Sequence, residues 1–75
     1  MSESGTIPVL SVVALLADLP KSGLVRGQVG TVVEQLGPTD YEVEFSDETG
    51  QAYAIVAVPV SQLMQLHHSP VSNVA

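Results

Sequence analysis

The sequence contains no cysteine and no tryptophan, and Lys21 and Arg26 are its only fixed cations among 75 residues. Without cysteine, disulfide bonds and thiolate metal sites are excluded. Two cations stand against eight acids, which gives a formal net charge of -6. Proteins that bind phosphate backbones need clustered Lys and Arg to neutralise them. We therefore expect neither nucleic acid nor an anionic membrane surface as a partner.

Long hydrophobic runs are also missing. The two most apolar stretches, residues 9–17 and 52–60, are shorter than the ~20 residues that cross a bilayer. Residues 1–8 show no basic region followed by an apolar core, so they do not read as a secretory signal. These absences predict a cytoplasmic protein.

Side chains that carry chemistry are scarce. No histidine lies within the expected folded region, and no serine has a nearby base in a recognisable arrangement. His67 and His68 are adjacent, so their side chains point apart, and a tail is a better interpretation than a metal site. We predict no enzymatic activity, no cofactor and no metal.

Apolar residues, in contrast, are abundant. Hydrophobic residues make up 45% of the chain and charged residues 13%. A chain this short has a high ratio of surface to volume and cannot bury all of that apolar surface. The exposed remainder indicates an interface. The alternative is that alanine and valine inflate the count and that little apolar surface is exposed.

The segment 41–45 has the clearest strand pattern. Tyr41, Val43 and Phe45 alternate with two glutamates, so the apolar side chains share one face and the acids face water. Residues 47–50 then form a hairpin turn, with Gly50 in a left-handed conformation. The returning strand, 51–58, ends at a proline that cannot donate to a ladder.

Further strands are expected on either side of this hairpin. Residues 9–16 predict a first strand, because the run is short and contains β-branched residues. A second strand covers 26–34, where Gly27 permits positive φ and Gly30 allows a bulge or a close backbone approach. Residues 61–63 suit a single helical turn, and 63–66 a last short strand.

This order predicts an all-β fold, a small SH3-like barrel of about five strands with one short helical turn before the last strand. We place the barrel at residues 8–66, between a flexible N-terminal segment, 1–7, and a flexible C-terminal tail, 67–75.

The first and fourth expected strands carry apolar residues on both faces, although a barrel buries only one. We predict that the spare face contacts another protein, either a second copy of this chain in a homo-oligomer or an unidentified partner. The residues expected to make this contact are Leu10, Val12, Tyr53 and Ile55. Which face of the first strand is buried stays open, because a one-residue slip exchanges the two sets.

Acidic residues are concentrated around the hairpin. We predict that Glu42, Glu44, Asp47 and Glu48 form a face that steers a basic partner. The alternative is a solvated surface that only keeps the protein soluble.

A family resemblance rests on residues 23–34, GLVRGQVGTVVE, with YEVEF at 41–45, the Asp47-Glu48 pair and Gly50. Together with VVAL at 12–15 and DLP at 18–20, these residues resemble the small bacterial family, frequent in cyanobacteria, known as domain of unknown function 4926. The resemblance implies an SH3-like barrel without an established activity. It also suggests, as an alternative, an antitoxin-like partner of a neighbouring small protein.

The stretch from Gly27 to Val33 also looks like the glycine-centred, KOW-like motif of nucleic-acid and ribosome-associated barrels. Those barrels are basic where they touch RNA, whereas the matching strands here carry glutamates. Charge therefore disfavours that role, and we expect an interaction module that self-associates or docks on a partner protein.

Overall fold

The computed structural model describes residues 7–67, which fold into a five-stranded antiparallel sheet with its connecting turns and loops. Its largest part is a meander of three consecutive strands, β2 (Val29–Gln35), β3 (Asp40–Ser46) and β4 (Ala52–Pro59). The turn between β3 and β4 contains Gly50 at φ 87°, as the sequence predicts.

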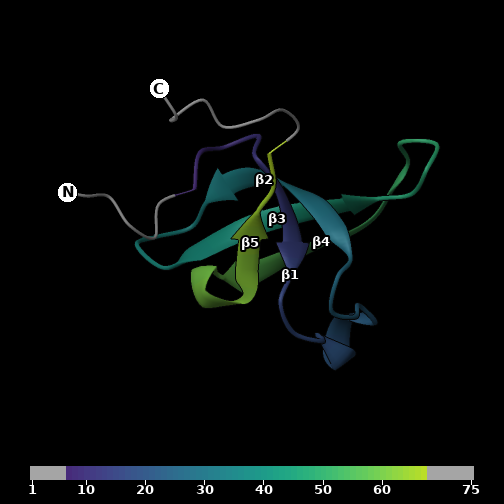
Figure 1. Ribbon diagram of the computed structural model, residues 1–75, viewed down its shortest axis with the longest axis horizontal. Helices are drawn as coiled ribbons and strands as arrows, with labels where there is room; N and C mark the ends of the chain where they lie inside the picture. Colours follow the sequence, from purple (N-terminus) through teal and green to yellow (C-terminus); the bar gives the residue numbers. More distant parts are fainter. Residues whose placement is uncertain (1–6, 68–75) are drawn as a thin grey trace, which may run out of the picture.

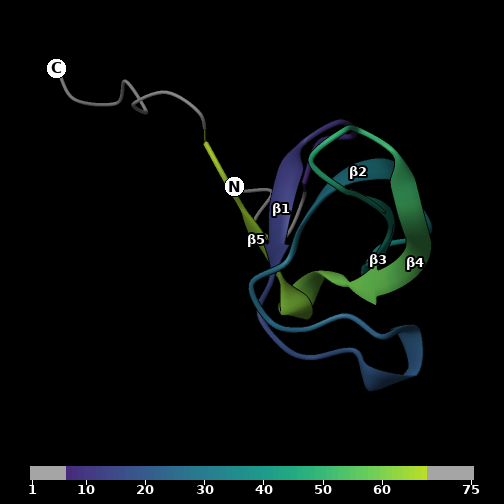
Figure 2. The same cartoon turned by 90° about the vertical axis from the view of Figure 1, so that its right-hand side faces the viewer.

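Two shorter strands complete the sheet. β1 (Val12–Leu15) pairs with β2 on one side and with β5 (Leu63–Gln65) on the other, so that the order is β4-β3-β2-β1-β5. The sheet curls around its inner face and stays open between β4 and β5 (Figures 1 and 2). This is the predicted small SH3-like barrel.

The inner face of the curled sheet is the core. The strand period of two places alternate residues on the same face, and the three alternate apolar residues of β3 all have 0% exposure. The whole core draws on every strand, the β1–β2 loop and the N-terminal segment. It consists of Ile7, Val13, Leu15, Leu24, Val32, Tyr41, Val43, Phe45, Val58 and Leu63.

β2 approaches β3 too closely for a side chain at Gly30. A Cβ there would lie 2.7 Å from Val43 Cγ1 and 2.8 Å from the Glu44 carbonyl oxygen. The register also shifts by one residue between Val32 and Glu34, which is a β-bulge. The close approach expected of this glycine is therefore confirmed, and the bulge follows shortly after it.

Two 3-10 turns flank the sheet. η2 (Val60–Gln62) is the helical turn expected before the last strand. A second turn, η1 (Pro20–Ser22), lies in the loop between β1 and β2 and was not predicted as helical. It starts at a proline and ends at Gly23, whose φ of 72° closes it with a left-handed residue.

The first strand is shorter than its apolar run. The prediction of a strand from residue 9 was wrong at its start, because Val9 and Leu10 form a turn closed by a 3.1 Å bond from the Ser11 N–H to the Pro8 carbonyl. Leu10 has φ 78°, which bulky residues rarely adopt. Apolar character alone therefore did not distinguish turn from strand.

The core begins before residue 8. Ile7, which the sequence analysis assigned to the flexible N-terminal segment, is buried, and its N–H donates to the Tyr41 hydroxyl at 3.0 Å. The other residues of that segment, 1–6, and all but His67 of the predicted C-terminal tail lie outside the described residues.

Candidate interaction surface

The outer face of β4 exposes large apolar side chains in the middle of the sheet's longest strand. Tyr53 is 50% exposed and Ile55 57%, and no residue of β4 is charged. In the register, Ile55 lies opposite Glu44 and Ala57 lies opposite Glu42. The exposed apolar row therefore runs directly beside two carboxylates.

Tyr53 lies at a second β-bulge. Phe45 pairs with Ala54 and Ser46 pairs with Ala52, so Tyr53 is the extra residue between them. The Gln28 side-chain amide donates to the Tyr53 hydroxyl at 3.0 Å. This bond ties the ring to the loop before β2 and orients its exposed side.

A second apolar row crosses β5, β1 and β2 on the same outer face. Met64 and Val29 both pair with Ala14 and are about half exposed. Gln28, the residue before Val29, is the partner of Tyr53, so the two apolar groups meet at the start of β2.

The acidic residues of the outer face are neighbours on adjacent strands. Glu34 and Glu42 are direct cross-strand partners, and Glu44 follows Glu42 on the same face of β3. Directly opposed like charges destabilise a strand pair. No ion pair within residues 7–67 involves any of the three, so nothing in the described chain neutralises them.

Asp47 has a different role from Glu42 and Glu44. Its Oδ1 accepts bonds from the Thr49 hydroxyl at 2.7 Å, the Thr49 N–H at 2.9 Å and the Gln51 N–H at 3.0 Å. These bonds lower the pKa of the Asp47 carboxyl below its ordinary value, and the bond from the Thr49 hydroxyl has the largest effect. Asp47 therefore closes the β3–β4 turn, where Glu48 is also exposed, whereas Glu42 and Glu44 lie within β3.

The four predicted contact residues lie at different places on the surface. Tyr53 and Ile55 lie together on β4, whereas Leu10 is 73% exposed on the turn before β1. Val12 is half-buried in β1, opposite Thr31, and shares a cross-strand row with Ile55 through Thr31 and Glu44. Three strand spacings, about 14 Å, separate Val12 from Ile55.

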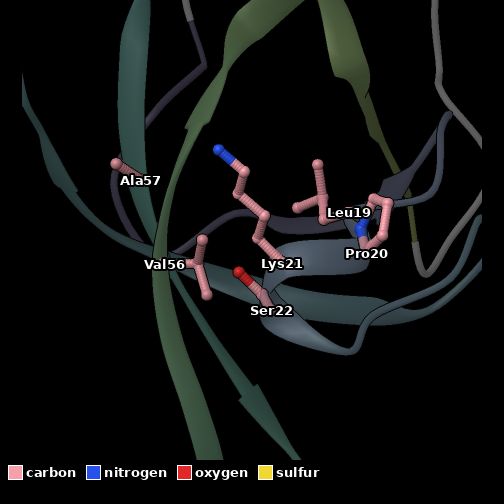
Figure 3. Close-up of a pocket in the computed structure, with 6 residues that line it drawn as sticks. All are labelled: Leu19, Pro20, Lys21, Ser22, Val56 and Ala57. Carbon is pink, nitrogen blue, oxygen red and sulfur yellow. The ribbon is translucent and has the colours of Figure 1, made fainter.

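A pocket of about 310 Å³ lies where the β1–β2 loop faces β4. Figure 3 shows Val56 directed from β4 toward η1, while the Lys21 side chain extends from η1 toward β4. The lining is almost entirely apolar apart from Lys21 and Ser22, and consists of Leu19, Pro20, Lys21, Ser22, Val56 and Ala57. The pocket was not predicted from the sequence, because no local pattern shows that the loop lies against β4.

The edge of β4 beside this pocket has open backbone groups. The Val60 N–H donates to the Thr39 carbonyl at 2.7 Å, which marks a hydrogen-bonded position next to the ladder. Such positions alternate with non-hydrogen-bonded ones in an antiparallel pair, so Ile55 and Ala57 direct their N–H and C=O away from β3. No other backbone bond within residues 7–67 reaches either residue.

Other site chemistries find no support in the described part of the chain. Residues 7–67 contain no group of three or more His, Asp or Glu side chains placed to hold a metal ion. His67 is exposed and His68 lies outside the described residues. None of the described helical segments is both long and apolar enough to span a membrane.

Comparison with protein families identifies one match. The model of a domain of unknown function, DUF4926, matches residues 9–65, which is more than half of the chain, and the chain therefore belongs to this family. No curated protein matches the sequence. No solved structure matches it either.

Proposed function

We propose that this member of the DUF4926 family is a non-enzymatic protein–protein interaction module that docks on a partner protein through the outer face of β4. The observation that carries the proposal is the exposure of Tyr53 and Ile55 beside Glu42 and Glu44. Apolar anchors next to charged groups are the usual composition of a docking patch.

The two parts of this patch contribute differently. Tyr53 and Ile55 supply the apolar area whose burial stabilises a complex, and the bond from Gln28 orients the tyrosine in advance. Glu42 and Glu44 add specificity and speed association with a basic surface, an effect that salt screens.

Charge also favours a different protein over a second copy. Self-association would bring together two chains of net charge -6 and would place the carboxylates of one copy near those of the other. A partner with a basic surface would instead neutralise the opposed Glu34 and Glu42.

The test compares proteins retained from an extract of the source organism by the wild type and by a double variant, Tyr53→Ser with Ile55→Ser. Leu36→Ser is the matched control, because Leu36 is also exposed but lies in the turn after β2, a strand that β3 separates from β4. We expect at least one protein to be retained by the wild type and the control and lost from the double variant.

Two results would overturn this proposal. One is that the double variant retains the same proteins as the wild type. The other is a wild-type protein that retains nothing and behaves by light scattering as a stable oligomer disrupted by Ile55→Ser, which would make a second copy the occupant of the patch.

A further inference from the structure

We infer that the partner binds as an extended segment that adds a strand to the open edge of β4, with apolar side chains directed into the pocket and basic side chains on the outer face. This inference rests on the proposed function and names the chemistry of the partner.

Beyond the bulge at Tyr53, the edge of β4 lacks the features that normally prevent strand addition. Exposed edges are usually short, charged or interrupted by proline. β4 is eight residues long, carries no charge, and has a proline only at its last position, Pro59. β5, the other edge, has three residues. The N–H and C=O groups of Ile55 and Ala57 therefore offer a hydrogen-bonding template.

The pocket determines which side chains an added strand would carry. It lies between η1 and Val56, beside the same edge, so a strand paired with Ile55 and Ala57 would direct alternate side chains over it (Figure 3). A volume of about 310 Å³ and an apolar lining suit aliphatic side chains. Lys21, which is exposed, lines the pocket and contributes its methylene stem to the apolar lining.

Charge determines the remaining side chains. Those on the outer face of the added strand would lie two strand spacings, about 10 Å, from Glu42 and Glu44. That distance is within reach of a long basic side chain and comparable to the Debye length of about 8 Å at physiological salt. An alternating apolar and basic segment therefore satisfies the ladder, the pocket and the carboxylates together.

The probe is the blocked peptide acetyl-Lys-Val-Lys-Val-Lys-Val-Lys-amide, titrated into the full chain and followed by NMR of the backbone amides. Two matched probes replace lysine by glutamate or N-methylate alternate backbone amides. We expect the lysine probe to bind at least about tenfold more tightly than the glutamate probe, and more weakly as salt rises.

Hydrogen exchange reports strand addition directly. The amides of Ile55 and Ala57 should exchange about tenfold more slowly when nine-tenths of the protein is occupied, since only the free fraction exchanges. The amide of Val56, which points toward β3, should not change. The N-methylated probe should lose at least about tenfold in affinity.

Ala57→Pro removes the edge N–H at a position that does not donate to β3, and prolines are tolerated on edge strands. Ala57→Ser keeps the N–H and is the control. We expect the proline variant to lose the lysine probe and the serine variant to keep it. If Ala57→Pro unfolds, the N-methylated probe still decides the question.

Three results would overturn the inference: equal binding of the lysine and N-methylated probes, tighter binding of the glutamate probe, or no change in exchange at Ile55 and Ala57 when lysine probe is present at millimolar concentration. If the extract experiment nevertheless shows a partner lost from the Tyr53→Ser, Ile55→Ser variant, the interaction module stands and only strand addition fails.

Discussion

The two faces of β3 and β4 are built from alternate residues of the same two strands but differ in burial and in charge. On the inner face, Phe45 and Val43 are completely buried, so substitutions at either position disturb the core. On the outer face, Ile55 is exposed beside Glu44, and nothing in the described chain covers it. Folding thus buries the inner face and leaves apolar side chains of the outer face exposed.

This difference predicts very unequal effects of truncation. Phe45→Ala should destabilise the protein by about 3–5 kcal/mol, because it leaves a large cavity in a small core. Ile55→Ala should cost less than about 1 kcal/mol, because its side chain is mostly in water already. Urea unfolding measures both. Equal losses from the two variants would mean that Ile55 is buried in solution.

The close approach at Gly30 gives the next largest effect. Gly30→Ala would place a Cβ 2.8 Å from the Glu44 carbonyl oxygen, a backbone atom that cannot move without disturbing the ladder. We expect a loss of about 1–3 kcal/mol, typical of overpacking. Thr31→Ala, at the neighbouring outward position, is the control and should cost clearly less in the same thermal or urea melt.

Leu10 should respond in the opposite direction. Its left-handed backbone costs about 1–2 kcal/mol in a non-glycine residue, so Leu10→Gly should stabilise the protein by up to about 1 kcal/mol after the entropy of the unfolded chain is counted. Val9→Gly, at the adjacent position without positive φ, should destabilise it. Loss of stability in Leu10→Gly would show that the leucine side chain makes a stabilising contact.

The smallest effect concerns Asp47 and depends on pH. Its folded-state pKa is lowered, so its contribution to stability is complete above the unfolded value of about 3.9 and is lost as the pH falls through the folded value. Asp47→Asn should therefore melt below the wild type at pH 7, with the difference shrinking toward pH 2.5. A constant difference across this range would exclude the carboxylate as its cause.

The sequence predicted what depends on alternation and turn chemistry. The β3 strand, the role of Gly50 and the SH3-like arrangement all follow from local patterns, and the structure confirms them. It did not predict the start of β1 or the core role of Ile7. The start of β1 was missed because apolar residues also form the turn from Pro8 to Ser11. The role of Ile7 was missed because it depends on a contact distant in sequence, the bond to the Tyr41 hydroxyl.

In the candidate site, too, the features set by local pattern were predicted and those set by tertiary contacts were not. The exposure of Tyr53 and Ile55 was expected, because apolar residues occupied both faces of their strand. The pocket between η1 and β4 was missed, because it exists only once the loop is folded against the strand. The role of Asp47 in closing the β3–β4 turn was also missed, since a carboxylate that closes a turn and one that does not look alike in a sequence.

The position of β1 has a consequence for how the chain folds. The meander from β2 to β4 joins neighbours in sequence, and it can form with short loops. β1 must instead find β5, and the pair Val13 and Gln65 links residues 52 positions apart. Closing so long a loop is entropically costly. During synthesis, β1 therefore leaves the ribosome long before β5 is made. Until then, the backbone groups on one side of β1 have no strand to pair with.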